Sequence, residues 1–564
     1  MRRSESSTVI AAALSLLCML AFAGHLDARP SQRTCEQLAG LKIPASAIGL
    51  PTNGAVVTAV TLVSASVQSA AALPEYCKVL ASIKPVDAHA PAINFELDLP
   101  SNWNRKIVML GGGGYNGVIP STSGNVPAGP ADQPVPLARG YAVFGSDSGH
   151  QANEYGMLDA SFAFNAESVR NYAGDALKKT RDAAVYLIRA RYGIERPDRA
   201  YFAGGSTGGR EALEVVLRWP KDWDGAISLY PAWNAITLDL QVGRVARALA
   251  QPGGYLNQAK RELLYEATLA ACDELDGAAD GIVSNVAACN SKFDPATATW
   301  KGRPLRCPGG ADVGDACLSD AQLATLQAYS TPMVFQSPLD SGEKQYPGYN
   351  IYGADLGRAT TKPLQDIVTF LALGTETPTN PMPAHAPSLD LFWDQWTRYF
   401  VARDINYNSL GVDPQNLGAL RARVNELSRL LDINQTDFSA FASKGGKLLI
   451  AHGTADVLVS TRSTEQYFDR LQATMGTAKV HDFIRFYEIA GYGHAVSTVF
   501  NAAWDSLTTL ENWVEKGVAP PVQIAADTVG LPGRTRPLCE YPSWPKYRGE
   551  GDVNAASSFV CTVH

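Results

Sequence analysis

Short apolar runs alternate with amphipathic stretches in two separate parts of the chain. The apolar runs are rich in β-branched, aromatic or aliphatic residues and are bounded by glycine or charge, which predicts short buried strands. In the first part, strands are predicted at residues 106–110, 141–145, 199–203 and 226–230, and helices at 172–192 and 210–219. In the second part, strands are predicted at residues 447–451 and 483–489, and a helix at 507–516. Strand alternating with helix predicts an α/β fold with a parallel sheet and helices on both faces.

The stretch between these two parts, residues 231–442, breaks the alternation. It contains many prolines, glycines and aromatic residues, and four of the chain's cysteines. An insertion of this size between two sheet strands would lie over the strand ends as a lid. We therefore expect one catalytic domain formed by residues 24–230 and 443–564, and a lid domain formed by 231–442. The aromatic segment 391–400 is interpreted either as a pocket wall or as the ordinary core of the lid.

The first 23 residues have the pattern of an export signal. Arg2 and Arg3 precede an apolar stretch at residues 9–22, which ends in the small-residue pattern Ala21-Phe22-Ala23. The stretch is too short and too weakly flanked for stable membrane insertion, and no second segment approaches spanning length. A signal peptide at residues 1–23 and a secreted or periplasmic protein are expected, with a retained anchor as the alternative.

Composition limits the kinds of partner that the protein can bind and indicates its redox compartment. A formal charge of −7 and the lack of a basic run argue against nucleic acid. Beyond the signal segment the number of cysteines is even, which in an exported chain predicts disulfides. Zinc is disfavoured because there is no C-x-x-C motif and no histidine at ligand spacing. These eight cysteines are Cys35, Cys77, Cys272, Cys289, Cys307, Cys317, Cys539 and Cys561.

A G-x-S-x-G motif, Gly204-Gly205-Ser206-Thr207-Gly208, lies between a predicted strand and a predicted helix. Such a sharp turn exposes the serine hydroxyl, and only glycine neighbours let the chain pass so closely. The motif predicts Ser206 as a nucleophile and the amide of Thr207 as an oxyanion donor. A phosphate loop is disfavoured because no G-K-[ST] follows. The four glycines after strand 106–110 suggest Gly114 as the second oxyanion donor.

A serine nucleophile needs a histidine base and a carboxylate that orients it. In the α/β-hydrolase fold these residues follow the serine in the order acid, histidine. His494 lies in a glycine-punctuated loop after a strand, and Asp456 lies in the loop after strand 447–451. Asp147 is the competing acid but precedes the serine, and His452 ends a strand and is assigned a structural role. The sequence therefore predicts the triad Ser206, Asp456 and His494.

Within the insertion, three aspartates lie in a glycine-bent loop that begins at Cys272. Asp273, Asp276 and Asp280 could supply carboxylate oxygens to calcium, which prefers six to eight oxygen ligands. An acidic turn without metal is the alternative. Since a serine esterase needs no metal for its chemistry, the calcium would be structural.

Together these elements resemble the tannase and feruloyl esterase family, which includes mono(2-hydroxyethyl) terephthalate hydrolase. The resemblance covers nearly the whole mature chain and extends to the ending Arg534-Thr535-Arg536-Pro537-Leu538-Cys539. It implies an α/β-hydrolase core with a large inserted lid, the same triad, and oxyanion donors Gly114 and Thr207. It also implies calcium held by Asp273, Asp276 and Asp280 with the carbonyls of Ala278 and Ile282. The disulfides that it implies are Cys35–Cys77, Cys272–Cys289, Cys307–Cys317 and Cys539–Cys561.

One departure concerns the triad itself. Many family members have a cysteine before the serine and another after the histidine, and a disulfide between them. Here these positions are Gly205 and Ala495, so the His494 loop must be held by packing.

The expected activity is hydrolysis of small-molecule aromatic acid esters, of feruloyl or galloyl type, through an acyl-enzyme. A terephthalate half-ester is an alternative substrate, although the lid arginine that binds its carboxylate is not matched here. Two other hypotheses keep the fold: a secreted binding protein with a silent site, and a serine peptidase, against which the acidic loop argues.

Overall fold

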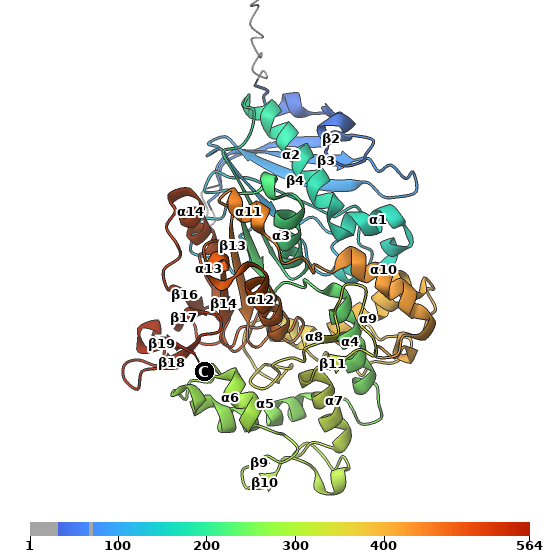
Figure 1. Cartoon of the computed structure of the whole chain (residues 1–564), viewed down its shortest axis with the longest axis vertical. Coiled ribbons are helices and arrows are strands. Elements are labelled where there is room, and N and C mark those ends of the chain that lie inside the picture. Colours follow the sequence, from blue (N-terminus) through green and yellow to red (C-terminus); the bar gives the residue numbers. More distant parts are fainter. Residues whose placement is uncertain (1–31, 67–71, 564) are drawn as a thin grey trace, which may run out of the picture.

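A computed structural model describes residues 32–66 and 72–563 of the chain (Figure 1). The expected signal peptide, residues 1–23, lies outside the described residues. Within the described ranges, no helix combines the length and the apolar character that a membrane span needs.

A mixed sheet forms the centre of the molecule, and its middle strands are parallel. In the described residues it has 13 strands, in the order β1-β2-β3-β4-β6-β5-β7-β8-β13-β14-β17-β16-β15. All strand pairs from β6 to β14 are parallel. These six strands match the predicted ones to within one or two residues. Their bounds are β5 Lys106–Leu110, β6 Ala142–Ser146, β7 Arg199–Gly205, β8 Gly225–Leu229, β13 Lys447–Gly453 and β14 Ile484–Ile489.

Helices cover both faces of these parallel strands. Alternate strand residues point to opposite faces, so Ile107 and Met109 of β5 enter one core cluster while Val108 and Leu110 enter the other. On the first face pack α2 (Ala176–Tyr192), α3 (Thr207–Arg218) and α12 (Thr461–Met475). On the second face packs α14 (Ser506–Lys516). The fold is the expected α/β-hydrolase type.

Both edges of the sheet are antiparallel, which the sequence pattern did not predict. One edge consists of β1 (Lys42–Ile43), β2 (Ala55–Val63), β3 (Tyr76–Ile83) and β4 (Ile93–Pro100). The other consists of β17 (Thr535–Glu540), β16 (Gln523–Asp527) and β15 (Ala502–Ala503). β4 and β17 carry a mixed polar and apolar sequence, which gives a weaker strand signal than a fully buried apolar run, whereas β2 is mostly apolar.

The long insertion enters and leaves the sheet between two neighbouring strands. β8 pairs with β13 in parallel, although residues 230–446 separate them in sequence. The insertion packs around its own apolar core below the sheet (Figure 1). Trp393, Trp396 and Phe400 of the aromatic segment are fully buried in that core. Its longer helices are α4 Ala235–Leu249, α5 Gln258–Cys272, α7 Asp320–Ser330, α9 Ser388–Gln395 and α10 Arg421–Leu431.

Shorter elements complete the described chain. The short helices are α1 Ala166–Arg170, α6 Val286–Lys292, α8 Gln365–Leu371, α11 Ser439–Ser443 and α13 Thr477–His481. The small two-stranded sheets are formed by β9 Thr299–Trp300 with β10 Arg303–Pro304, β11 Met333–Val334 with β12 Gln345–Tyr346, and β18 Trp544–Tyr547 with β19 Phe559–Thr562.

Four disulfides join the pairs that the resemblance implied. They are Cys35–Cys77, Cys272–Cys289, Cys307–Cys317 and Cys539–Cys561. Cys272–Cys289 closes the segment that contains the acidic loop, and Cys539–Cys561 joins β17 to β19.

Candidate active site

Ser206 occupies a sharp turn between β7 and α3. Its backbone angles, φ 61° and ψ −123°, lie in a region that residues with a side chain rarely adopt. The flanking glycines are required by close contacts: a Cβ on Gly204 would lie 2.3 Å from the Gly208 carbonyl oxygen, and one on Gly208 would lie 2.7 Å from the Gly112 oxygen. The structure thus has the strained serine turn that the glycine spacing predicts.

The two predicted oxyanion donors, Gly114 and Thr207, lie against each other. The Thr207 hydroxyl donates to the Gly114 carbonyl oxygen at 2.6 Å. Asn116 N donates to the Gly113 carbonyl oxygen at 2.8 Å. The Gly114 N–H belongs to the same peptide group as that carbonyl, so it points in the opposite direction. Within the described ranges, neither the Gly114 nor the Thr207 amide donates a hydrogen bond. Both amides are therefore free to bind a developing oxyanion.

Glu211, on the first turns of α3, fixes the glycine loop. Its carboxylate accepts hydrogen bonds from Gly112 N at 3.0 Å and from the Asn116 side chain at 2.7 Å. Glu211 is buried, and burial raises its pKa, partly offset by the nearby charge of Arg210. Glu211 thus connects α3 to the glycine loop that carries Gly114.

Asp456 and His494 form a buried hydrogen-bonded pair. Asp456 Oδ2 lies 2.8 Å from His494 Nδ1, and Asp456 Oδ1 accepts from Leu458 N and Val459 N. Burial alone would raise the pKa of Asp456, but the charge of His494 and the hydrogen bonds from both histidines hold that pKa well below its usual range. A carboxylate that stays ionised at Nδ1 keeps Nε2 of His494 unprotonated in the neutral ring, as a general base requires.

A second histidine, His452, supports the same carboxylate. His452 Nε2 lies 3.2 Å from Asp456 Oδ2 and 3.0 Å from the Val459 carbonyl, and Nδ1 lies 2.8 Å from the Thr464 hydroxyl. A neutral ring with its proton on Nε2 satisfies all three contacts. The sequence assigned His452 a structural role, and in the structure it contacts the same Asp456 oxygen, Oδ2, as His494 does.

Tyr230 connects the serine turn to the histidine. Its ring centroid lies 4.8 Å from that of His494, and a Cβ on Gly205 would lie 2.4 Å from the Tyr230 ring. Tyr230 directly follows Leu229, whose carbonyl accepts the Ser206 amide at 3.0 Å. The ring thus occupies the space beside Gly205 and packs against His494. Sequence reasoning missed Tyr230, because only the pairing of β8 with its neighbours brings it there.

Ser206 and His494 lie at the same edge of the sheet, at the carboxyl ends of β7 and β14. No direct hydrogen bond joins them within the described part of the chain. Hydrogen bonds to a catalytic serine are often long before substrate binds, so the pair remains a candidate nucleophile and base.

Asp147, the competing acid, lies elsewhere. Its carboxylate accepts from the Asn94 and Gly149 amides and from the Gln151 side chain. It therefore fixes the turn after β6, and no hydrogen bond links it to His494 among the described residues.

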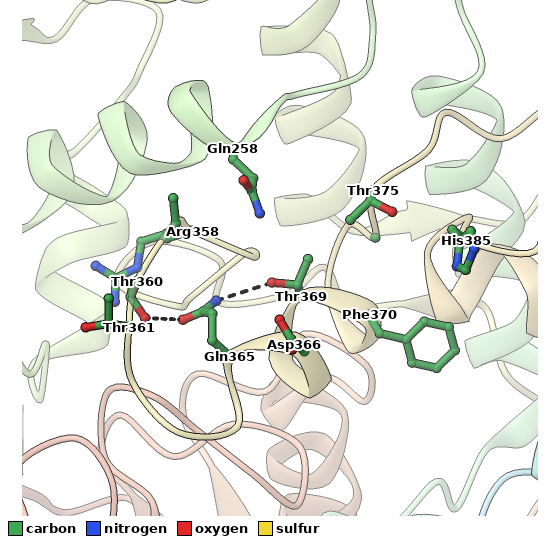
Figure 2. Close-up of a pocket in the computed structure, with 12 residues that line it drawn as sticks. Gln258, Arg358, Thr360, Thr361, Gln365, Asp366, Thr369, Phe370, Thr375 and His385 are labelled. Carbon is green, nitrogen blue, oxygen red and sulfur yellow. Dashed lines mark hydrogen bonds between the residues drawn. The ribbon is translucent and has the colours of Figure 1, made fainter.

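Helix α8 separates two cavities above His494. A small cavity is lined by His494 together with Val368 and Leu371 of α8. On the other side, a cavity of about 600 Å³ is lined mainly by hydrogen-bonding side chains, with Gln365, Asp366, Thr369 and Phe370 of α8 among them (Figure 2). Figure 2 also shows Gln258 of α5 and His385 facing this larger cavity. A third, small cavity beside Thr207 is lined by Phe392, Trp396 and Phe400. The aromatic segment thus contributes both to the lid core and to a cavity wall.

The acidic loop has donor chemistry that suits calcium. Burial raises the pKa of Asp273 and of Asp276 to about 6, and the charge of Asp280 adds to both shifts. Asp276 is fully buried, and a bound cation would compensate for the cost of its charge.

The arrangement of this loop is that of a hydrogen-bonded acidic turn. Asp273 accepts from Gly281 N, Asp276 accepts from Ala278 N, and Asp280 accepts from Ile282 N and pairs with Arg536. Across residues 32–66 and 72–563, no three acidic, histidine or cysteine side chains converge as a metal cluster. The donor set fits calcium in its chemistry, while its side chains are held by amides and an arginine.

Comparisons with known proteins agree with this geometry. A family model described as "Tannase and feruloyl esterase" matches residues 77–562. The chain is 40% identical to an uncharacterized esterase of Agrobacterium fabrum, over 93% of this chain and 92% of that protein. It is 30% identical to the mono(2-hydroxyethyl) terephthalate hydrolase of Piscinibacter sakaiensis, over 88% of this chain and 86% of that one.

A solved structure supports the fold. The structure of feruloyl esterase B from Aspergillus oryzae matches with a TM-score of 0.72 at 22% identity, covering 94% of this chain and 100% of that one. The family match spans most of the chain, and both the core and the contacts around Ser206 fit an ester hydrolase. The chain is therefore a carboxylic ester hydrolase that belongs to the tannase and feruloyl esterase family.

Proposed function

We propose that this enzyme is exported and cleaves esters of aromatic acids, of feruloyl or galloyl type, with Ser206 as nucleophile. The observation that carries the mechanism is the Asp456–His494 hydrogen bond of 2.8 Å at the same sheet edge as the strained Ser206 turn. The export part is supported by the signal pattern in residues 1–23 and by four disulfides, which persist in oxidising compartments.

The reaction takes place in two half-reactions. His494 Nε2 removes the Ser206 proton as Oγ bonds to the ester carbonyl carbon, and the amides of Gly114 and Thr207 stabilise the oxyanion. The intermediate collapses, the carbon–alkoxy bond breaks, and His494 protonates the departing alcohol. Water, deprotonated by His494, then attacks the acyl-enzyme, and the aromatic acid leaves as Ser206 regains its proton.

The triad is tested with Ser206→Ala. We expect at least a 10³-fold loss of kcat on a chromogenic aryl ester and no labelling by a fluorophosphonate probe. Retained activity would contradict Ser206 as nucleophile. If the native protein were neither active nor labelled, the silent binding protein would be the better explanation.

A terephthalate half-ester is the second candidate substrate, because a relative named mono(2-hydroxyethyl) terephthalate hydrolase is 30% identical. Comparing kcat/KM for feruloyl, galloyl and terephthaloyl esters separates the two. A higher value for the terephthaloyl ester would favour the second candidate.

We also propose that the acidic loop binds structural calcium through Asp273, Asp276 and Asp280 with the carbonyls of Ala278 and Ile282. Support comes from the all-oxygen donor set and the raised pKa values of Asp273 and Asp276. Chelation should lower the unfolding temperature, and calcium should restore it. An unchanged unfolding temperature, with no metal found in the purified protein, would reject this site.

A further inference from the structure

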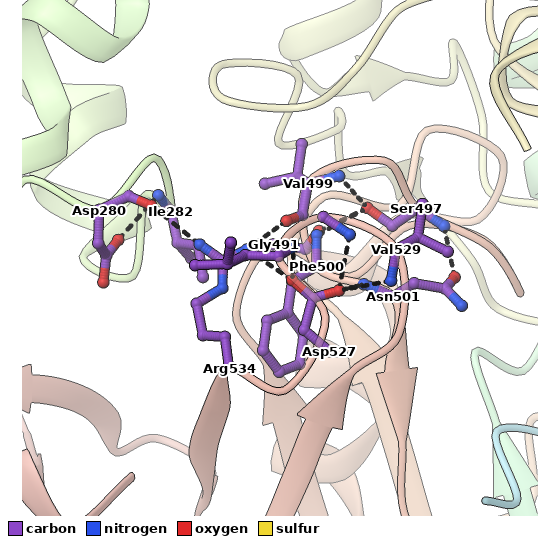
Figure 3. A network of polar contacts seen from close by, with 12 residues as sticks. Asp280, Ile282, Gly491, Ser497, Val499, Phe500, Asn501, Asp527, Val529 and Arg534 are labelled. Carbon is purple, nitrogen blue, oxygen red and sulfur yellow. Dashed lines mark hydrogen bonds and ion pairs between the residues drawn. The ribbon is translucent and has the colours of Figure 1, made fainter. Parts of the chain in front are cut away.

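We propose that Arg534 is a positioning residue that holds the His494 loop, residues 490–501, in its working geometry. The proposal rests on the proposed role of His494 as the base. It assigns a role to Arg534, the first residue of the C-terminal Arg-Thr-Arg-Pro-Leu-Cys segment. Figure 3 shows the contacts that connect Arg534 to this loop and to the acidic loop of the lid.

Ser497 closes the loop around His494. Its hydroxyl donates to the Gly491 carbonyl at 2.9 Å, so that the chain on either side of His494 is tied together. The same hydroxyl accepts from Val499 N and Phe500 N, and Ser497 N donates to the Asn501 side chain at 2.8 Å (Figure 3). The position of His494 therefore depends on where residues 497–501 are held.

Asp527, on β16, holds the far end of this segment. Its Oδ1 accepts from Asn501 N at 3.0 Å and also from the Val529 and Gly530 amides. Its Oδ2 accepts from Leu531 N and from the Arg534 guanidinium, both at 2.7 Å. Asp527 is buried, and its carboxylate is fully used by these donors.

Arg534 joins three segments through one guanidinium. Nη2 donates to the Val499 carbonyl and to Asp527 Oδ2, and Nη1 donates to the Asp280 carbonyl at 2.9 Å. The side chain is only 5% exposed, and its guanidinium lies over the Phe500 ring. The acceptors belong to the His494 loop, the end of β16 and the acidic loop. A planar guanidinium can bind all three at once, whereas a lysine ammonium on a flexible stem lacks the fixed fork.

Other hydrogen bonds also hold this loop: the Thr498 hydroxyl donates to Asp355, and the Thr498 carbonyl accepts from Lys362 at 3.0 Å. Residues 205 and 495 are glycine and alanine, so no disulfide can link these two positions. Packing against Tyr230 and the hydrogen bonds of Arg534 contribute to holding the loop in its place. Removing the guanidinium frees the Val499 carbonyl and leaves Asp527 without its only ion-pair partner among the described residues.

Arg536, on β17 and two residues after Arg534, offers a matched control. It is equally buried and also contacts the acidic loop, through an ion pair with the Asp280 carboxylate. Its guanidinium donates hydrogen bonds to Asp280 and to the Thr535 carbonyl, both of which lie outside the His494 loop. A change at Arg536 therefore tests burial and the acidic loop without touching the loop that carries His494.

The experiment compares Arg534→Lys, Ser497→Ala and Arg536→Lys with the native full chain. Each protein is labelled with a fluorophosphonate probe, and both the labelled fraction and the labelling rate constant are recorded, together with kcat and KM on an aryl ester. A role limited to folding changes the labelled fraction, whereas a positioning role changes the rate constant of the molecules that do label. Ser497→Ala removes the hydrogen bonds through which residues 497–500 are tied to Gly491 and removes no charge, so it keeps the test usable if Arg534→Lys folds poorly.

We expect Arg534→Lys and Ser497→Ala to lower kcat and the labelling rate constant by about 10- to 100-fold, with KM within about threefold, because small displacements of a catalytic group have costs of this size. Arg536→Lys should keep both rates within about threefold. Unchanged rate constants in both the Arg534 and Ser497 variants would overturn the proposal, and so would an equal loss in Arg536→Lys. Failure of the proposed function would instead appear as a native enzyme that does not label or a Ser206→Ala variant that stays active.

Discussion

Gly205 lies next to Ser206, the proposed nucleophile, and the ring of Tyr230 occupies the space that a side chain at residue 205 would need. A Cβ added at Gly205 would lie 2.4 Å from this ring, which is shorter than van der Waals contact permits. Tyr230 cannot retreat freely, because it is buried and its other neighbours include the His494 ring. A side chain at residue 205 would therefore displace the base as well as the tyrosine.

Gly205→Ala should lower kcat by about tenfold or more, because the shift passes through Tyr230 to His494. The measurement is steady-state hydrolysis of an aryl ester at saturating substrate. Gly411→Ala is the matched control: a Cβ there meets nothing closer than 3.7 Å. Equal kcat values for the two variants would show that Tyr230 does not transmit the change.

Asp98, on β4, is a buried carboxyl far from the reaction chemistry. It is fully buried, and one of its oxygens has no hydrogen-bond partner in the described structure. Burial raises its pKa to about 7, opposed by the hydrogen bond from Thr122 and reinforced by the charge of Glu96. Its protonated form is therefore favoured in the folded protein at neutral pH and below.

A carboxyl whose pKa is higher folded than unfolded stabilises the fold below its unfolded pKa, near 4, and loses that contribution as pH rises through about 7. Asp98→Asn removes the titration. Between pH 4 and pH 9, the free energy of unfolding of the native enzyme should fall by on the order of 1–4 kcal/mol relative to that of this variant. Denaturant unfolding of both proteins across this range checks it, and a pH-independent difference would contradict the assignment.

Residue roles that depend on local spacing can be predicted from the sequence, whereas roles that depend on long-range packing cannot. The serine turn could be predicted because its glycines, strand and helix are contiguous. The Asp456 and His494 assignments follow from chain order, and the structure brings these two into contact. Tyr230 and Arg534 could not be predicted, because their roles depend on neighbours that are distant in sequence and become adjacent only through the sheet.

At the scale of elements, the central parallel strands are predicted and the sheet edges are not. The six parallel strands β5, β6, β7, β8, β13 and β14 are largely buried on both faces, which favours apolar sequence. β2 is largely exposed over its second half although its sequence, AVVTAVTLV, is mostly apolar, so its strand signal was present and was missed. The opposite edge places Asp527 at the end of β16, Arg534 directly before β17 and Arg536 on β17, beside the loops of the proposed site.

Helix α8 is the element that divides the small cavity at His494 from the larger cavity. Leu371 lines the small cavity, while its helix neighbours Thr369 and Phe370 line the large one. The partition is thin, since α8 has only seven residues. Replacing Leu371 with a smaller residue should join the two spaces.

Leu371→Ala should favour an aromatic ester with a bulky alcohol over the methyl ester of the same acid. We expect the ratio of their kcat/KM values to rise by about two- to tenfold, because one or a few methylenes in an apolar pocket change binding by this much. Ile367→Ala is the control on the same helix, because Ile367 is 48% exposed and lines neither cavity. The ratio of the two kcat/KM values is the readout. An unchanged ratio in Leu371→Ala would mean that α8 does not limit the alcohol group.

At the scale of the whole molecule, the disulfides close loops of different lengths. Cys35–Cys77 spans 42 residues and ties the N-terminal segment to β3, whereas Cys307–Cys317 spans 10 residues inside the insertion. Restricting the unfolded chain stabilises the fold more when the closed loop is longer.

Replacing both cysteines of Cys35–Cys77 with serine should therefore lower the free energy of unfolding by about 4 kcal/mol. The same change at Cys307–Cys317 should lower it by about 2.7 kcal/mol. Guanidinium unfolding of the two variants beside the native enzyme measures the difference. A larger cost for the shorter loop would show that native contacts at that bridge, rather than chain entropy, dominate.

The insertion between β8 and β13 also sets the order in which the enzyme can mature during its synthesis. A ribosome adds about 5–20 residues per second, so the nascent chain displays Ser206 roughly 15 to 60 s before His494 exists. Until residues 447–456 have been made, β8 lacks β13, one of its two partner strands, and Ser206 lacks both Asp456 and His494, its proposed acid and base. The growing polypeptide is thus a hydrolase that cannot act on esters until its last fifth has been translated and docked.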